Sequence, residues 1–314
     1  MFDHQLNRLR LEVSLEPRGP VLIRRGRAGA DPTRPNLECV RTTVDGKPSV
    51  YLPGSSLKGV LRSHAERLLR SEGLAITPTF DEKTEKRLDQ RTPGDEVHRE
   101  TCPLGRLFGS LHLRSRLAIS DCLPGGFEPP GSSERSQQIE RANRTEDRNG
   151  VAIDRLLGSV SGGALYDQEV VVAGRFDGQI VLQNFQLYQL ALLLYLLRDL
   201  DAGFLQIGSS TTRGFGWVSV ALRRLVIETN RGGALPGRLL GVGVLDQREE
   251  AAAYRFFDGD EIALPESWVA GPDPARFFAQ LELRSSDRDE LERRLSAGPW
   301  QRFLDQARGQ RWVA

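Results

Sequence analysis

The stretch YLPGSSLKGVLRSHAERLLR, residues 51–70, decides how the chain is interpreted, because two kinds of chemistry share its pattern. Its apolar residues recur at helical spacing, which predicts a helix that begins at Ser55 or Ser56. Ser55 and Lys58 also have the S-x-x-K spacing of serine acyl-enzymes. Alternatively, the turn at Gly54 followed by the free N–H groups of a helix start favours a bound phosphate.

The acyl-enzyme interpretation fails because that chemistry needs a second basic element, usually a K-T-G strand. No lysine follows Lys86 in the sequence. Phosphate binding explains the neighbouring residues better. Ser55 and Ser56 can cap the helix or donate hydroxyl groups, and Lys58 and Arg62 project from one helix face. A capped amphipathic helix with solvated charges is the alternative.

The composition is typical of a globular protein. The 314 residues are 39% hydrophobic and 27% charged, and no apolar run is long enough to span a bilayer. The N-terminal stretch MFDHQLNRLR has no hydrophobic signal core, and three cysteines are too few for a disulfide framework. We therefore expect a cytoplasmic protein with no membrane partner. Four lysines among 43 basic residues leave mostly arginine, which suits phosphate contacts but also follows from a GC-rich genome.

The order of predicted elements indicates an α+β fold. In chain order, the patterns predict a strand (5–16), a hairpin with Asp45-Gly46 at its turn (38–53), the first helix (from 55 or 56 to 73), a polar insertion (74–110), a strand (111–124), a mobile loop or extended arm (123–150), a strand pair (163–183), a buried helix (185–200) and a glycine-rich loop that enters a strand (205–228). The order β-α-β, insertion, β-α-β is typical of a split ferredoxin-like fold.

A second candidate site lies in the stretch GSSTTRGFGWVSV. Gly208, Gly214 and Gly216 surround Arg213 and Phe215 there. Glycine lets a backbone approach a phosphodiester closely, and an arginine can pair with it. The alternative is a glycine-rich turn with Phe215 in the core. We expect this loop and the helix-starting turn to lie against each other and form one track for a ribose-phosphate strand.

Four motifs in register are similar to a known family. They are YLPGSSLKGVLRS, RLFGS, AIDRLLGSVSGGALYDQEVV and IGSSTTRGFGWVSV. Over roughly residues 5 to 228 the chain resembles the RAMP superfamily and, more narrowly, the repeated backbone subunit of type III CRISPR effector complexes. The resemblance implies a modified ferredoxin-like (RNA-recognition-motif) palm within a RAMP domain at 1–229, with a lid-like insertion at about 74–110 and an extended thumb at about 123–165. Residues 230–314 form an α+β extension outside the resemblance, expected to be a packing layer or a docking face.

The resemblance also implies partners and contact residues. A CRISPR guide RNA, its target RNA and other effector subunits are the expected partners. The palm would hold the guide backbone and the thumb would wedge into the guide–target duplex, while base pairing reads sequence. The implied RNA-binding residues are Gly54, Ser55, Ser56, Lys58, Gly59, Arg62, Arg155, Arg213, Gly214, Phe215 and Gly216.

An aspartate in the loop before the first helix supports target cleavage in the family. Asp31, in GRAGADPTRP, is the best match, and its carboxylate could hold Mg²⁺ beside the scissile phosphate. Asp45 competes on proximity, but Asp-Gly between two strand-like segments is typical of a hairpin turn. The expected function is therefore metal-dependent RNA cleavage within a ribonucleoprotein. A non-cleaving structural subunit and a guide end-capping or processing member are the alternatives.

Zinc is a weaker expectation. Relatives often carry a zinc knuckle just before the RLFG motif, and this chain has His98 and Cys102 at that place. Gly105 stands where a C-x-x-C pair would need its second cysteine, and a structural zinc needs four ligands. Cys39 or Cys122 would have to complete the set from elsewhere.

Overall fold

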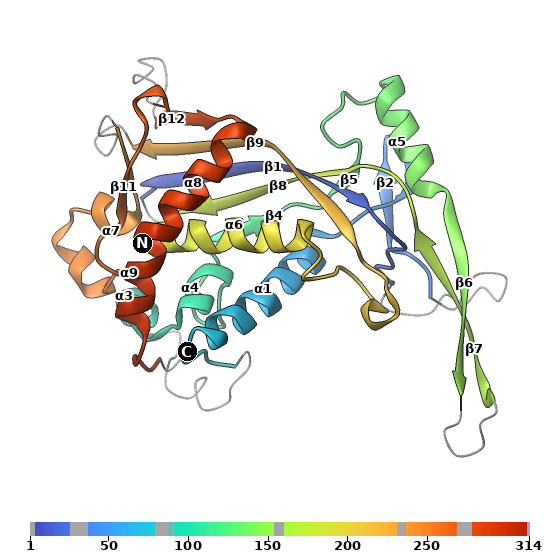
Figure 1. The fold of residues 1–314 in the computed structure, drawn as a ribbon, viewed down its shortest axis with the longest axis horizontal. Coiled ribbons are helices and arrows are strands. Elements are labelled where there is room, and N and C mark those ends of the chain that lie inside the picture. Colours follow the sequence, from blue (N-terminus) through green and yellow to red (C-terminus); the bar gives the residue numbers. More distant parts are fainter. Residues whose placement is uncertain are drawn as a thin grey trace.

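An antiparallel sheet runs through the centre of the protein (Figure 1). The computed structural model describes residues 4–25, 37–78, 88, 91–153, 160–230, 237–268 and 278–312. Five strands lie in the order β12-β9-β1-β8-β4, and β5 also pairs with β8. Their bounds are β1 (Asn7–Pro17), β4 (Leu117–Ile119), β5 (Leu123–Pro124), β8 (Phe176–Gln183), β9 (Val218–Asn230) and β12 (Phe278–Leu283).

Two β-α-β units build the sheet. One is β1, α1 (Gly54–Ser71) and β4; the other is β8, α6 (Leu187–Asp201) and β9. Their strands interleave in the order β9-β1-β8-β4, with every neighbouring pair antiparallel. The predicted α+β, ferredoxin-like fold is therefore confirmed.

Alternating side chains decide which face of the sheet is buried. Leu9, Leu11 and Val13 of β1 are at most 1% exposed and face the core. On the intervening positions Arg8 and Arg10 pair with Glu228 of β9 and stay partly in solvent. The helices α6 and α1 lie on one side of the sheet (Figure 1). Helix α6 is buried around most of its surface, as its leucine content predicts, because α8 (Arg288–Leu295) and α1 also contact it.

The predicted hairpin is confirmed. It consists of β2 (Arg41–Val44) and β3 (Lys47–Val50), and its turn places Asp45 at φ 49° and Gly46 at φ 78°. Those left-handed values are why an Asp-Gly pair suits the turn. In the insertion at 74–110, the described residues include two short helices, α3 (Gly94–Glu100) and α4 (Pro103–Phe108), and we call this segment the lid.

Of the two alternatives predicted for 123–150, the mobile loop is wrong, whereas an extended arm does begin in this range with β6 (Thr145–Ile153). The segment contains α5 (Ser133–Asn143), whose start is capped by the Ser132 hydroxyl. Arg135, with its side chain about 90% buried, binds Asp45 at 2.9 Å and is within 3.2–3.5 Å of three backbone carbonyl groups. These bonds satisfy a cation that composition alone assigns to solvent.

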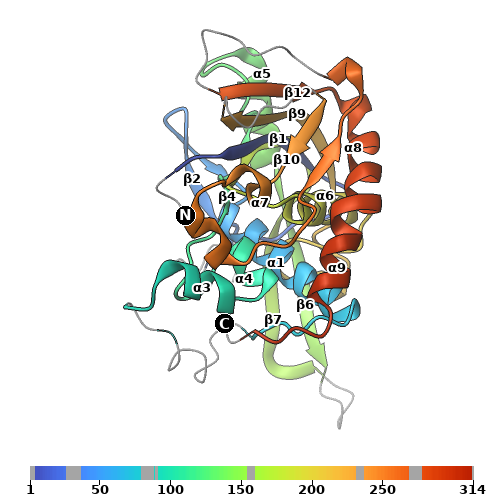
Figure 2. The ribbon, with the colours of Figure 1, turned by 90° about the vertical axis from the view of Figure 1, so that its left-hand side faces the viewer.

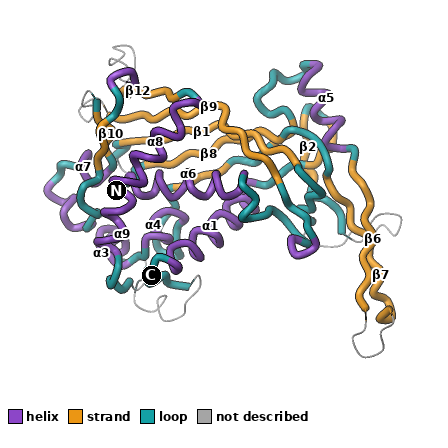
Figure 3. The backbone as a smooth tube through the Cα atoms, in the orientation of Figure 1, coloured by secondary structure: helices purple, strands orange, loops and turns teal. Residues whose placement is uncertain are grey.

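A long hairpin projects from the body of the protein (Figure 3). It consists of β6 (Thr145–Ile153) and β7 (Val160–Val171). Strand β7 therefore pairs with β6 and not with β8, contrary to the expected strand pair over 163–183. The hairpin falls partly in the range predicted for the thumb and continues beyond it to Val171.

The C-terminal extension packs on the palm. Strand β12 pairs with β9 and so adds an edge strand to the sheet. One side of the molecule is lined by α8, by α9 (Gln301–Ala307) and by the π-helical turn between them, Ser296–Trp300 (Figure 2). Tyr188 of α6 stacks on Phe303 of α9, with ring centroids 4.1 Å apart. The remaining elements are β10 (Arg238–Leu240), α7 (Val242–Leu245), β11 (Glu261–Ala263) and the short turns Thr211–Arg213, Glu249–Tyr254, Glu266–Trp268 and Ser285–Asp287. Within the described ranges, no helix is long and apolar enough to cross a bilayer.

Candidate nucleic-acid interface

The two glycine-bearing turns lie at the same end of the sheet (Figure 1). The first, residues 52–59, is called the helix-start turn, and the second, residues 207–217, the glycine-rich loop. Strands β1 and β4 both run antiparallel to β8, so the C-terminal ends of β1 and β4 point to the same end of the sheet. Gly54 contacts the end of β4 there, and the glycine-rich loop enters β9 at the residue paired with Pro17, the end of β1. Both turns therefore lie at one end of the sheet, while the single track for a ribose-phosphate strand that the sequence analysis expects from them stays a prediction.

Two glycines fold the glycine-rich loop onto the chain that follows β1. A Cβ atom at Gly208, where φ is 83°, would lie 2.3 Å from the carbonyl oxygen of Leu22. A Cβ atom at Gly216, where φ is 91°, would lie 2.3 Å from the carbonyl oxygen of Ile207. Gly214 also has a positive φ, but the space beside it is open. Only Gly214 therefore leaves room for a ligand to approach.

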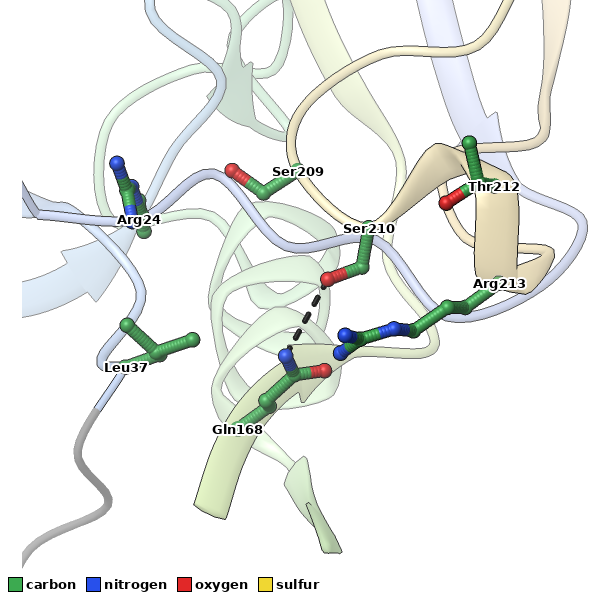
Figure 4. Close-up of a pocket in the computed structure, with 7 residues that line it drawn as sticks. All are labelled: Arg24, Leu37, Gln168, Ser209, Ser210, Thr212 and Arg213. Carbon is green, nitrogen blue, oxygen red and sulfur yellow. Dashed lines mark hydrogen bonds between the residues drawn. The ribbon is translucent and has the colours of Figure 1, made fainter. Parts of the chain in front are cut away.

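A polar cavity of about 480 Å³ lies beside this loop (Figure 4). Two guanidinium groups, three hydroxyl groups, one amide and one leucine line it: Arg24, Arg213, Ser209, Ser210, Thr212, Gln168 and Leu37. The Gln168 Nε2 donates a hydrogen bond of 3.2 Å to the Ser210 Oγ, which joins β7 to the loop. Arg24, Thr212 and Arg213 are exposed. The lining has positive charge and no carboxylate, so it suits an anion.

The described residues on either side of Asp31 lie at this cavity. Residues 26–36 lie outside the described part of the chain, and so does Arg155. On either side of the segment, the Arg25 N–H donates to the Glu38 carbonyl at 2.9 Å, and Leu37 joins the backbone of β7. Arg24 and Leu37 line the cavity. The described residues that flank the segment are therefore at the margin of the cavity.

Glu169 ties the base of the hairpin to the palm. Its carboxylate accepts hydrogen bonds from Arg41, from the Cys39 N–H at 2.9 Å and from the Thr145 hydroxyl at 2.8 Å. Burial alone would raise the pKa of Glu169, but these bonds outweigh it and lower the pKa. Burial and the neighbouring Glu169 raise the pKa of the Cys39 thiol to about 12, so Cys39 stays protonated. The hairpin base is therefore fixed beside the cavity.

The side chains of Lys58 and Arg62 both donate hydrogen bonds to other parts of the protein. The Lys58 ammonium donates to the Ser115 hydroxyl at 2.7 Å and to the Leu117 carbonyl at 2.9 Å. Arg62 donates to the Gly109 carbonyl at 2.7 Å. Burial, and then the nearby Arg62, lower the pKa of Lys58. Arg62 thus attaches α1 to the lid and Lys58 attaches it to the chain that leads into β4, and both are protein partners that the sequence analysis did not anticipate.

The helix start also differs from the prediction. Helix α1 begins at Gly54, and neither Ser55 nor Ser56 caps it. The Asp121 carboxylate accepts from the Gly54 N–H at 2.9 Å, so part of the positive helix end is already neutralised. Ser55 and Gly59 are exposed, and the space beside Gly59 is open. The exposed face of this turn is thus available, but it has less unmet positive charge than the sequence suggests.

Two further predicted residues have packing roles. Phe215 is half-buried and packs against the main core, which is the alternative that the sequence left open. His98 is 1% exposed, and its two ring nitrogens bond to the Tyr254 carbonyl at 2.9 Å and to Arg116 at 3.0 Å. Burial lowers the pKa of His98 well below its usual value. With both nitrogens engaged, His98 does not suit a zinc ligand, and no three potential ligands cluster among the residues described. Cys102 is buried and free.

Sequence reasoning missed most of the cavity lining. Arg24 lies in the arginine-rich stretch IRRGR, residues 23–27, in the loop that follows the first predicted strand. Ser209, Ser210 and Thr212 lie in the quoted glycine-rich stretch but were not singled out. Gln168 gives no signal, because its place depends on the pairing of β7 with β6.

Comparison with known proteins agrees with this arrangement. The family model described as RAMP superfamily matches residues 14–219, about two thirds of the chain. The matched range begins in β1 and ends in β9, so it includes both glycine-bearing turns and the projecting hairpin. The search of curated proteins found no match.

Proposed function

Because the chain belongs to the RAMP superfamily, whose members are CRISPR-associated RNA-binding proteins, we propose that it is a backbone subunit of a type III CRISPR effector complex. In this proposal it binds the guide RNA and cleaves the complementary target RNA in a Mg²⁺-dependent reaction. The observation that carries the proposal is the meeting of three features at one end of the sheet. These are the cationic cavity, the base of the projecting hairpin and the two ends of the segment with Asp31.

The guide backbone binds along the glycine-rich loop in this proposal. Arg213 and Arg24 are exposed on the cavity, and a guanidinium group pairs well with a phosphate. Gly214 leaves open space for close approach of the strand. The contacts are with phosphates, so they hold the RNA without reading its sequence. The exposed parts of the helix-start turn, Ser55 and Gly59, extend the same surface.

The projecting hairpin contacts the guide–target duplex in this proposal. Its base is fixed by Glu169, while its length carries it away from the palm (Figure 1). A rigid base and an extended arm suit a wedge at a base-pair step. Arg155, near the hairpin's tip in the sequence, would meet the RNA there.

Cleavage depends on Asp31. Mg²⁺ binds proteins through one or two carboxylates and keeps several waters, so a single aspartate can anchor it beside a phosphate. When bound, the metal offsets charge that develops on the scissile phosphate. The residues of this chain hold the strand, and in-line attack by the adjacent 2′-hydroxyl then depends on the backbone geometry at the displaced nucleotide.

Replacing Asp31→Ala in the reconstituted complex tests the proposal. Cutting at this subunit's position should fall by at least about 100-fold, because metal-based charge stabilisation is worth several kcal/mol. Guide binding and assembly should stay intact, as judged by gel filtration and co-purifying RNA. Asp45→Asn is the control, since Asp45 binds Arg135 and lies in a hairpin turn. Cutting at every position by the Asp31→Ala complex would leave a non-cleaving, RNA-holding subunit as the function.

A further inference from the structure

A second cavity lies between the lid and the C-terminal extension, away from the glycine-rich loop. It is about 360 Å³ in volume, and its lining comes from α3, α4, the chain around Phe256 and the region of α9. Figure 1 shows α3 and α9 at the opposite end of the sheet from the projecting hairpin. The charged lining residues are Arg99, Arg106, Arg255, Arg311 and Glu100. Four cations against one carboxylate favour an anionic ligand.

Arg106 is the best-placed cation in this cavity. Its residue is 2% exposed, and the Nε and Nη2 groups donate to the carbonyl oxygens of Thr101 and Arg99 at 2.9 and 3.1 Å. The guanidinium carbon lies 5.4 Å from the centre of the Phe257 ring. These contacts fix the orientation of the group. The buried Nη1 has no hydrogen-bond partner within the described chain.

A buried charged donor without an acceptor is costly, which indicates that a ligand supplies the acceptor. The side chain of Glu100 does not supply it: its ion pair is with Arg99, at 3.7 Å. Burial lowers the pKa of Arg106, and a bound anion would oppose that shift.

The rest of the lining indicates what kind of anion binds. Phe256 and Trp312 are half-buried and present apolar ring surface to the cavity beside the arginines. Small-molecule pockets have volumes of about 300–1,000 Å³, so this one exceeds the need of a lone phosphate. Aromatic rings and guanidinium planes stack on nucleobases. The cavity is partly open to solvent, and its aromatic residues suit a nucleobase better than the carboxylates of an acidic peptide.

We propose that this pocket binds a phosphorylated nucleotide. Arg106 and Arg311 hold the phosphate, and the base lies against Trp312. The ligand is either a free mononucleotide or the phosphorylated end of an RNA, which share this chemistry. The site is separate from the guide track, so it does not depend on the function proposed above.

Calorimetric titration of the full-length protein tests the proposal. The probes are uridine 5′-monophosphate, uridine, an RNA hexamer with or without a 5′-phosphate, and hexaglutamate. We expect the monophosphate to bind at least about tenfold more tightly than uridine, because charge-assisted hydrogen bonds are about twice as strong as neutral ones. Tighter binding of the phosphorylated hexamer than of both the monophosphate and the unphosphorylated hexamer identifies an RNA end as the ligand, because the guide track would bind the two hexamers alike. Equal binding of the two hexamers, with tight binding of the monophosphate, identifies a free nucleotide.

Variants locate the binding. Arg311→Ala should weaken monophosphate binding about tenfold or more. Arg293→Ala, which removes an exposed arginine of α8 that pairs with Glu290, should leave it unchanged. Arg106→Gln should abolish monophosphate binding. Because Arg106 is buried and also supports the lid, this variant can fail to fold, and the exposed Arg311 then carries the test through Arg311→Ala. Equal binding of uridine and its monophosphate, tighter binding of hexaglutamate, no binding at all, or equal effects of the two alanine variants would overturn the proposal.

Discussion

The helix-start turn and the glycine-rich loop differ in what their cations contact, although both have glycine, hydroxyl and basic residues. At the start of α1, Lys58 donates to the Ser115 hydroxyl and to the Leu117 carbonyl of β4, and Arg62 donates to the Gly109 carbonyl of the lid. In the glycine-rich loop, Arg213 is exposed and lines a polar cavity together with Arg24. The same residue types therefore hold the protein together at one turn and face a ligand cavity at the other.

The roles of the glycines differ as well. Gly54 allows α1 to begin directly against β4, and Gly208 and Gly216 fold the glycine-rich loop. Gly59 and Gly214 have open space beside them. The comparison teaches that a glycine-rich, basic motif mixes residues needed for packing with exposed residues, and that exposure separates Arg213 from the half-buried Lys58 and Arg62.

The largest expected effect comes from Gly54→Ala. Its Cβ atom would lie 2.3 Å from the carbonyl oxygen of Ile119, which is backbone and cannot move aside easily. We expect a loss of about 3 kcal/mol or more in the free energy of unfolding, at the upper end for overpacking. Gly59→Ala is the matched control on the same helix, and it should stabilise the protein by about 0.5–1 kcal/mol. Urea unfolding of both variants measures the difference. Equal stabilities would mean that Gly54 is not needed for packing.

The next effect concerns the hairpin base beside the cavity. Glu169→Gln should lower the free energy of unfolding by about 1–2 kcal/mol at pH 7, because it removes a charged acceptor shared by three donors. The loss of stability stays small because the Arg41 side chain is about a third exposed, so water screens its attraction to Glu169. Glu140→Gln, which breaks an exposed pair with Arg144, should cost at most about 0.5 kcal/mol.

The acid dependence sharpens this prediction. The folded-state pKa of Glu169 is lowered, so its stabilisation is present above the ordinary glutamate pKa and is lost as pH falls through the folded value. Wild type and Glu169→Gln should therefore converge in stability as the solution is acidified, as followed by chemical unfolding at several pH values. A difference that stays constant down to low pH would contradict the assigned role.

Much of the fold follows from the sequence, because periodicity reports burial directly. The alternation in β1 and the leucine-rich surface of α6 are enough to predict both elements and the β-α-β order. The turn at Asp45 was predictable for a local reason, since few residue pairs accept its backbone angles.

Features that depend on distant partners could not be predicted. Helix α5 has a polar composition, and it is held by the bond of Arg135 to Asp45, 90 residues away. Lys58 likewise bonds to Ser115 and Leu117, which lie 57 and 59 residues away in the sequence. The cavity joins residues from three separate parts of the chain. Motif resemblance pointed to the end of the sheet where the two glycine-bearing turns lie, whereas the contacts show which of their residues pack and which are exposed.

The most direct test of the account compares Arg213→Gln with Lys58→Met in binding to a single-stranded RNA across a range of salt concentrations. Each phosphate contact contributes about 0.7 to the slope of log K against log salt. We expect Arg213→Gln to reduce the slope by about that amount for every RNA sequence, with a several-fold loss of affinity. Lys58→Met should leave the slope nearly unchanged, because its ammonium bonds to Ser115 and Leu117. A reduced slope for Lys58→Met together with a normal slope for Arg213→Gln would contradict the claim that the glycine-rich loop holds the RNA backbone.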